Sequence, residues 1–370
     1  MAEGWLVYHL TGSALALGVI RFLHTIPVTL LSVVGGGLAD RYDKRRMLMI
    51  TQCLAMLMAF TLFVLTVTGV VEVWHVGVLA VGMGIVNAFD IPTRQSFIVE
   101  LVGKRDLMNA IALNSSVFNA SRIVGPAVAG LVISGVGVEY CFLLNAISFL
   151  FIILGYGCLR LPQHRVRSAD RLADRGISVA LRLVWATPSL RLLMGMAAVA
   201  SVFGMSYTTL MPVFAEDVWR VGPKGLGALL ASNGIGALMG SATLAYLSHT
   251  GRRDRILKIG VTGFSSGLIL FAVCPNVYLA MLALMVSGWF MILFFATTNT
   301  LVQGQVLDEF RGRIMGLYTL CFIGLSPFGA FLSGAIAKAF GAPFAVVFGA
   351  SVCLVASACL WRASIRVSSP

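Results

Sequence analysis

The sequence predicts an all-α protein that crosses a lipid bilayer many times. Of its 370 residues, 58% are hydrophobic and 11% are charged, whereas soluble domains have roughly 45–50% apolar and about 25% charged residues. Apolar stretches of about 20 residues, the length that spans the hydrocarbon as a helix, recur between clusters of Lys and Arg. These stretches are expected to be helices, because hydrocarbon offers the backbone no hydrogen-bond partners and barrel strands would be short and alternating.

Eleven full spans and one short apolar piece are expected. The short piece, residues 1–10, would rise only about 15 Å as a helix, about half the hydrocarbon thickness. We therefore expect most of a first transmembrane helix to be missing; the alternative is a re-entrant or external N-terminus. The full spans are expected at 13–39, 47–70, 74–93, 108–135, 139–159, 190–214, 224–247, 256–274, 277–303, 314–337 and 342–361.

The basic residues indicate which ends of the spans face the cytoplasm. Most of the 27 Lys and Arg residues lie in alternate loops or in the tail, and the intervening loops hold only Arg220, Lys224 and Lys338. The positive-inside rule places the basic loops in the cytoplasm. The net charge of +12 therefore reflects membrane topology and not nucleic-acid binding. We expect a multi-pass protein of the bacterial inner membrane.

A long Arg-rich interval divides the spans into two halves. The Leu-Ala pairs at Leu38 and Leu244 are 206 residues apart, and similar segments around Pro126 and Pro327 are 201 residues apart. Two similar offsets indicate duplication, a layout in which transporters bind substrate between the halves. The expected parts are an N-terminal bundle at 1–160, a central cytoplasmic loop at 161–188 and a C-terminal bundle at 189–370.

The segment GGLADRYDKRR, residues 36–46, resembles the signature loop between the second and third helices of the major facilitator superfamily. The resemblance implies that superfamily's fold of two six-helix bundles. Asp40 is expected to pair with a helix N-terminus, and the basic residues are expected to hold a carboxylate. Asp43 departs from the pattern, which usually has Gly there. The alternative is an ordinary positive-inside loop.

The segments DIPTRQ at 90–95, 109–130 and 299–320 resemble the branch of this superfamily that contains enterobactin exporters and secretion permeases. In the superfamily a carboxylate near this position joins the charged network of the signature loop, so Asp90 is expected to pair with Lys44 or Arg45. Alternatively, Asp90 caps the turn before Pro92. The candidate gating residues are Gly36, Leu38, Asp40, Arg41, Lys44, Arg45, Asp90 and Arg94.

A Gly-Pro pair in the fifth predicted span, Gly125-Pro126, together with Gly130, resembles the motif associated with antiporters. Proline removes a backbone hydrogen bond and permits a bend, and glycine permits close helix packing. This pattern favours export, although kinked spans occur in many membrane proteins.

Ionisable groups within spans are expensive and usually face a cavity or a partner. Arg21 and His24 share a helix face, and either His24 or Glu3 is expected to carry a proton. The alternatives are snorkelling of Arg21 and Arg122 toward an interface, and a structural role for a buried His24. The candidate cavity residues are Glu3, Arg21, His24, Asn119, Arg122, Asn299 and Gln303.

These patterns favour a proton-coupled exporter of a siderophore-like or drug-like small molecule, working by alternating access as a monomer. Metabolite uptake and an inactive truncated chain are the alternatives. A membrane-embedded sensor or enzyme would need a soluble domain or clustered acid and base groups, neither of which the sequence shows. No phosphate-binding loop, HExxH motif or cysteine pair at metal-ligand spacing occurs, so we expect no catalytic activity, cofactor or metal.

Overall fold

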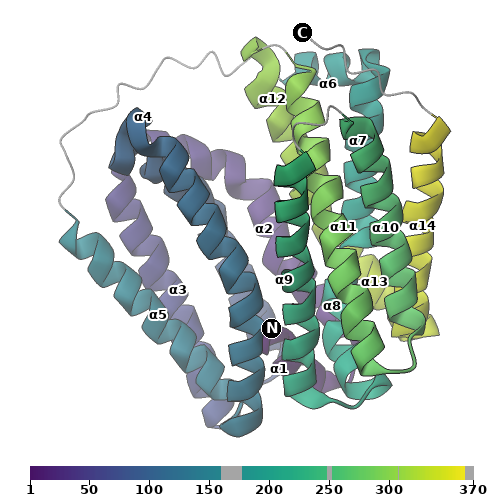
Figure 1. Cartoon of the computed structure of the whole chain (residues 1–370). Helices are drawn as coiled ribbons and strands as arrows, with labels where there is room; N and C mark the ends of the chain where they lie inside the picture. Colours follow the sequence, from purple (N-terminus) through teal and green to yellow (C-terminus); the bar gives the residue numbers. More distant parts are fainter. Residues whose placement is uncertain (160–176, 248–251, 307, 363–370) are drawn as a thin grey trace.

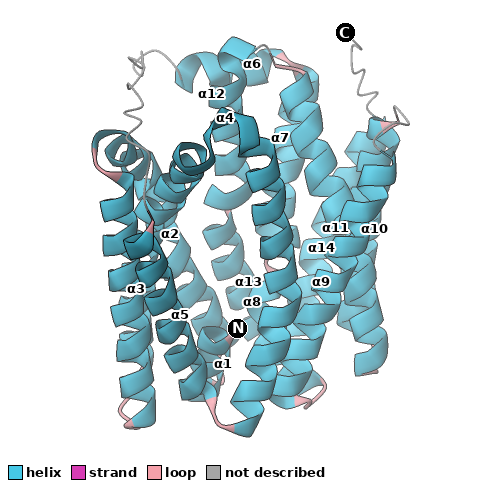
Figure 2. Cartoon of the chain, turned by 60° about the vertical axis from the view of Figure 1, so that its left-hand side comes forward, coloured by secondary structure: helices cyan, strands magenta, loops and turns pink. Residues whose placement is uncertain are grey.

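The computed structural model describes residues 1–159, 177–247, 252–306 and 308–362. Within these residues every regular element is a helix (Figures 1 and 2). Eleven described stretches are long and apolar enough to cross a membrane. The predicted polytopic all-α fold is therefore confirmed.

The helices follow one another closely along the chain. Two of the spans contain π-helical turns, written η, at which the backbone bonding shifts by one residue; one span has two of these turns and the other has one. The elements are α1 (Ala2–Thr11), α2 (Ala14–Arg41), α3 (Lys44–Val67), α4 (Val73–Gly135), α5 (Val138–Cys158), α6 (Ile177–Ala186), α7 (Pro188–Val199), η2 (Ala200–Gly204), α8 (Tyr207–Val213), η3 (Phe214–Val218), α9 (Gly222–Leu247), α10 (Arg253–Val273), α11 (Val277–Gly304), α12 (Asp308–Thr319), η4 (Leu320–Gly324), α13 (Ser326–Phe340) and α14 (Ala342–Arg362).

The continuous element α4 contains two spans that meet at Gly103. This glycine has φ 68° and ψ 177°, outside the helical region, and glycine adopts positive φ without steric cost. The sequence predicted a loop between residues 93 and 108. The helices extend further because hydropathy marks only the hydrocarbon part of a span, whereas helices continue into the polar interface.

The short helix α1 lies against α2, α4 and α8. Gly12, with φ 58°, ends α1 by donating its N–H to the carbonyl of Tyr8 at 2.7 Å. Ser13 then begins α2, its hydroxyl accepting the N–H of Ala16 at 3.4 Å. These two caps give a tight reversal between α1 and α2.

The N-terminal and C-terminal groups of helices pack together through two helix pairs, α2 with α13 and α4 with α9. We call the side opposite the basic loops the outer side. Figure 1 shows the two groups diverging toward the side of the basic loops. The structure thus places the contact between the halves mainly toward the outer side.

Two glycine contacts make this outer packing close. A Cβ added at Gly18 of α2 would lie 2.5 Å from the carbonyl oxygen of Ala330 in α13. A Cβ at Gly227 of α9 would lie 2.6 Å from the carbonyl oxygen of Pro126 in α4. Real side chains do not tolerate these distances, so the backbones can touch only because both positions are glycine. We call these two contacts the outer glycine seal.

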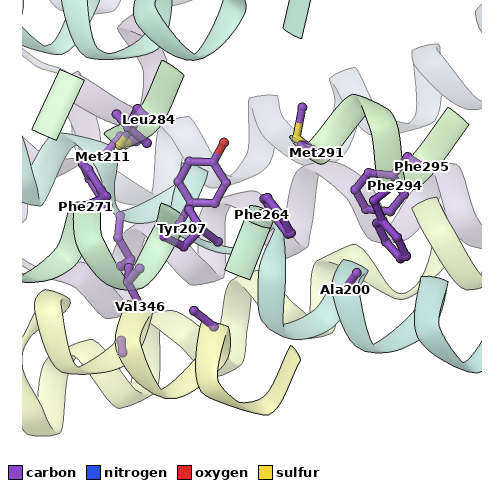
Figure 3. Packing of buried hydrophobic residues seen from close by; sticks show 14 of the residues in the cluster. Ala200, Tyr207, Met211, Phe264, Phe271, Leu284, Met291, Phe294, Phe295 and Val346 are labelled. Atoms are coloured by element: carbon purple, nitrogen blue, oxygen red, sulfur yellow. The ribbon is translucent and has the colours of Figure 1, made fainter. Parts of the chain in front are cut away.

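Large apolar side chains fill the interior of the C-terminal group of helices (Figure 3). Phe214, Phe264 and Phe271 are fully buried, and the rings of Phe214 and Phe271 have centroids 4.7 Å apart. Tyr207 is also buried, with its hydroxyl pointing away from Val346 (Figure 3). These side chains form the apolar core of the C-terminal group.

Candidate functional site

The turn between α2 and α3 contains the predicted gating loop. Asp43 caps α3, because its carboxylate accepts the backbone N–H of Arg46 at 2.7 Å. An aspartate at this position stabilises the helix start, which explains the departure from the usual glycine. Arg41 is exposed at the end of α2, and the side chain of Asp40 lies outside the described part of the structure.

The basic side chains of this loop have partners on the cytoplasmic side. The Lys44 ammonium lies 2.8 Å from the Glu100 carboxylate. The Arg45 guanidinium donates to the carbonyl of Gly157 at 2.6 Å. These contacts join the start of α3 to the part of α4 just before Gly103 and to the C-terminal end of α5.

Asp90 is buried, 1% exposed, and its partners differ from those predicted. Its carboxylate accepts hydrogen bonds from Thr51 at 2.9 Å and Gln52 at 2.7 Å, and it forms an ion pair with Arg94, one turn along α4. The predicted pair with Lys44 or Arg45 is therefore wrong for this conformation. Asp90 lies ten residues before Glu100, about 15 Å along the helix, too deep for side chains at the start of α3.

A close helix approach at Gly36 is absent, since a Cβ there would meet nothing within 4 Å. The neighbouring Gly35 makes that approach instead, with its added Cβ 2.2 Å from the carbonyl oxygen of Ala88 in α4. Leu38 is partly exposed. Sequence alone did not show which of the consecutive glycines at 35–37 faces α4, because successive residues of a helix point in directions that differ by about 100°.

The antiporter-like segment forms part of the contact between the halves. The backbone of Gly227 packs against the carbonyl oxygen of Pro126. A Cβ added at Gly130 would lie 2.7 Å from the carbonyl oxygen of Pro223. Gly125 has open space around its Cα and lines a cavity. The segment thus combines a backbone contact with a cavity wall.

A cavity of about 220 Å³ lies where α1, α2, α8 and α9 meet. Three of the predicted cavity residues, Glu3, Arg21 and His24, line it. The Glu3 carboxylate lies 3.8 Å from Nδ1 of His24. Thr208 and Thr209 add polar groups from the C-terminal half, so both halves contribute to this central cavity.

Asn87 of α4 completes the group around His24, and its side-chain nitrogen lies 3.4 Å from Nε2 of the imidazole. Gly84 makes this possible, because an added Cβ there would lie 2.2 Å from the carbonyl oxygen of His24. The sequence analysis missed Asn87; its spacing of three residues from Gly84, on one helix face, is the signal that could have indicated it.

A second cavity of about 460 Å³ lies within the N-terminal group of helices and shares Glu3 and His24 with the first. Its lining is mainly apolar and includes Met58, Met83 and Phe142. Glu3 and His24 therefore stand between a cavity at the contact of the halves and an apolar space among α3, α4 and α5.

The remaining predicted residues lie outside the described lining of both cavities. Arg122 approaches α9, since its carbonyl oxygen would lie 3.2 Å from a Cβ at Gly234, and its guanidinium interacts electrostatically with Tyr207. Asn299 and Gln303 hydrogen-bond to each other at 2.5 Å along α11. Asn119 also has an interaction partner, so the predicted polar stripes do not converge on one point.

The sequence analysis missed the outer glycine seal, although the internal repeat carried a signal for it. Gly18 and Gly227 are 209 residues apart, and Gly130 and Gly334 are 204 residues apart. These separations are close to the repeat offsets of 206 and 201 residues. Gly334 faces α2, with an added Cβ 2.8 Å from the carbonyl oxygen of Ala14, so each helix pair has glycines on both sides of its contact.

Comparison with known proteins places the chain among transporters. The family model of transmembrane secretion effectors matches residues 1–369. The multidrug efflux pump Tap of Mycolicibacterium fortuitum is 29% identical, over 92% of this chain and 85% of Tap. The enterobactin exporter EntS of Salmonella typhimurium is 25% identical, over 93% of this chain and 78% of EntS. The expected resemblance to the enterobactin exporter branch is confirmed.

The fold is also found in solved transporter structures. The inward-facing, unoccupied structure of a bacterial homologue of the human lysosomal transporter Spinster has a TM-score of 0.78. It is 13% identical, and the match covers 98% of this chain and 93% of the homologue, a likeness that concerns the fold. Together with the eleven membrane spans, these findings show that the chain is a multi-pass bacterial inner-membrane protein belonging to the transmembrane secretion effector family of the major facilitator superfamily.

Proposed function

We propose that the chain is a proton-coupled exporter that moves an amphipathic, siderophore-like or drug-like small molecule by alternating access. The observation that carries this proposal is the central cavity, to which both halves contribute and which contains the ionisable pair Glu3 and His24. Binding between two halves that rock around a fixed site is the usual arrangement of secondary transporters. Relatives named as an efflux pump and an exporter support the outward direction.

The proton is proposed to bind at the Glu3–His24 pair. A protonated His24 forms an ion pair with Glu3 across 3.8 Å, and loss of that proton removes this partner of the Glu3 carboxylate. A change of one charge in a low-dielectric space alters the relative stability of the two conformations. Export then follows if the proton is taken up on the outer side and released on the cytoplasmic side.

The gating loop is proposed to control the cytoplasmic side. The Lys44–Glu100 ion pair and the hydrogen bonds from Thr51 and Gln52 to Asp90 hold α3 and α4 together within one half. The moving bodies would be the bundles at 1–160 and 189–370, connected by 161–188, within a monomer. Rocking of the bundles would bring the inner end of α2, with Gly36, Leu38 and Asp40, toward the C-terminal half.

Everted membrane vesicles that contain the full chain test the proposal. Respiration acidifies the vesicle lumen, and acridine orange fluorescence reports proton release when a candidate substrate such as enterobactin or a drug is added. The Glu3→Gln variant is expected to abolish the response, whereas Glu216→Gln, at an exposed outer position, is expected to retain it. The proposal fails if a broad panel of siderophores and drugs gives equal responses in vesicles with and without the chain.

Metabolite uptake remains the alternative direction of transport. Radiolabelled substrate should accumulate in everted vesicles if the chain exports and in right-side-out vesicles if it imports. Immunoblotting of both preparations keeps the amount of protein equal. Accumulation only in right-side-out vesicles would replace the exporter with a permease.

A further inference from the structure

Two arginine side chains inside the membrane spans, the exposed Arg21 and the half-buried Arg122, lack in the described part of the chain the carboxylate partner that several other cations of the protein have. Lys44 pairs with Glu100, Arg94 with Asp90, and Lys258 with Asp254 at 2.9 Å. Among the described residues, by contrast, neither Arg21 nor Arg122 has a carboxylate within salt-bridge distance. An uncompensated cation at membrane depth is costly and usually marks a substrate pathway.

The position of Arg21 shows where its charge acts. It is exposed and lines the central cavity together with Glu3 of α1 and Thr208 of α8. The only carboxylate of that described lining, Glu3, lies 3.8 Å from Nδ1 of His24. Arg21 therefore contributes a positive charge to a space that residues of both halves line.

Arg122 lies deeper along the contact between the halves. It is thirteen residues from Gly135, the outer end of α4, which corresponds to about 20 Å along a helix. Its charge interacts electrostatically with Tyr207 of the C-terminal half, which also contacts the amide of Asn233. Both side chains are neutral.

The surroundings of Arg21 are apolar apart from these polar groups. Leu17, Ile20, Met211, Pro212, Leu226 and Leu230 form most of the remaining lining of the central cavity. A ligand that satisfies this site needs an apolar body beside an anionic group. A guanidinium binds a planar carboxylate through two parallel hydrogen bonds, and binds a phosphate equally well.

We propose that the transported molecule is an amphipathic organic anion, whose carboxylate or phosphate group binds Arg21 in the central cavity and passes Arg122 on the way from the cytoplasm. This inference rests on the proposed function, since it names the substrate class of the same cavity. It assigns Arg21 as a binding residue and Arg122 as a second cation on the pathway. An anion is preferred over a neutral molecule of the same shape, because a hydrogen bond from the guanidinium to a charged group is stronger than one to a neutral group.

Direct binding to the purified full chain in phosphatidylcholine nanodiscs tests the inference without requiring transport. The probes share one aromatic body and differ in charge: 1-naphthoate, 1-naphthamide and 1-naphthylmethylammonium. Isothermal titration calorimetry is expected to show naphthoate binding about ten-fold or more tightly than naphthamide, because a hydrogen bond to a charged group is much stronger than a neutral one. The ammonium probe is expected to bind most weakly.

Variants locate the binding charge. Arg21→Gln is expected to remove the preference for naphthoate over naphthamide, Arg21→Lys to retain part of it, and Arg122→Gln to reduce it. Arg255→Gln, at an exposed position on the cytoplasmic side, is the matched control and should leave it unchanged. The thermal midpoint of each unliganded variant, measured in parallel, separates a loss of binding from a loss of folding; if Arg21→Gln unfolds, Arg21→Lys decides.

Three outcomes overturn the inference: naphthoate does not bind, it binds no better than naphthamide, or its preference survives in Arg21→Gln. A lipid headgroup could supply the same phosphate chemistry, so the titrations are repeated in nanodiscs that contain phosphatidylglycerol. Loss of the naphthoate preference only in those nanodiscs would assign the site to lipid and also overturn the inference. Selective anion binding without any vesicle transport would instead leave the anion site standing and reject the proposed exporter.

Discussion

The outer glycine seal gives a prediction whose size follows from the structure. A Cβ at Gly18 would lie 2.5 Å from the Ala330 carbonyl oxygen, and ordinary contact begins at 3.4 Å. The Gly18→Ala variant must therefore move α2 and α13 apart by the difference, about 0.9 Å, and Gly227→Ala needs about 0.8 Å between α9 and α4. Overpacking of this kind costs about 1–3 kcal/mol at each site.

The double variant Gly18→Ala/Gly227→Ala should then lose about 2–6 kcal/mol from the outer-closed conformation, since distant sites are nearly additive. Every 1.4 kcal/mol changes the ratio of the two conformations about ten-fold. The outer-open fraction should therefore rise by one to four orders of magnitude, up to saturation. Substrate efflux should fall, because a transporter must close its outer side in each cycle.

Accessibility of the central cavity from outside measures this change. A cysteine at Thr208, in the cavity lining, is labelled in intact cells with a membrane-impermeant thiosulfonate, and labelling of the same background without that cysteine is subtracted. The double glycine variant should label much faster. Gly195→Ala is the matched control, because a Cβ at that position meets nothing within 4 Å. Equal labelling rates for the double variant and the control would refute the argument.

Three further predictions concern single side chains. Asp43→Ala should lower the stability of the purified protein by about 0.5–2 kcal/mol through loss of the α3 cap, seen as a lower thermal midpoint, whereas Asp43→Asn should retain most of it. Asp90→Ala should cost about 3–5 kcal/mol, because the buried Gln52 loses its acceptor and Arg94 its counter-charge; wild-type thermal stability would contradict this. Tyr8→Phe removes the hydrogen bond from α1 to Asp217 and should raise outer labelling of the cavity cysteine by about ten-fold or more, because a hydrogen bond to a charged group contributes about 1.5–3 kcal/mol; unchanged labelling would show that this bond does not hold the outer side closed.

The sequence predicted the spans well because membrane solvation is a strong and local constraint. Each span from α2 to α14 was recognisable as an apolar stretch between loops, whereas α6 forms within the predicted central loop at 161–188. The errors lie at the polar ends: α10 begins at Arg253 and α12 at Asp308, both before the apolar run. Hydropathy cannot show how far a helix continues into the interface.

The candidate site was less predictable, because its geometry depends on helix rotation and depth. Glu3 and His24 come together from different helices, as expected for ionisable groups that seek a shared cavity. Asp90 was assigned the wrong partner because its depth relative to Lys44 depends on where α3 starts. Asn299 and Gln303 were placed on one face correctly, but at a spacing of four residues they satisfy each other.

The outer glycine seal also determines what can regulate the conformational cycle. The seal consists of Cα and carbonyl atoms of Gly18, Ala330, Gly227 and Pro126, which carry no ionisable group. Ionic strength and pH therefore leave its strength unchanged, while they act on charged contacts such as Lys44–Glu100. Electrolyte conditions would thus act on charged contacts, Lys44–Glu100 on the cytoplasmic side and Tyr8–Asp217 on the outer side, and a rate that varies with internal salt alone would identify the cytoplasmic side as the slow gate.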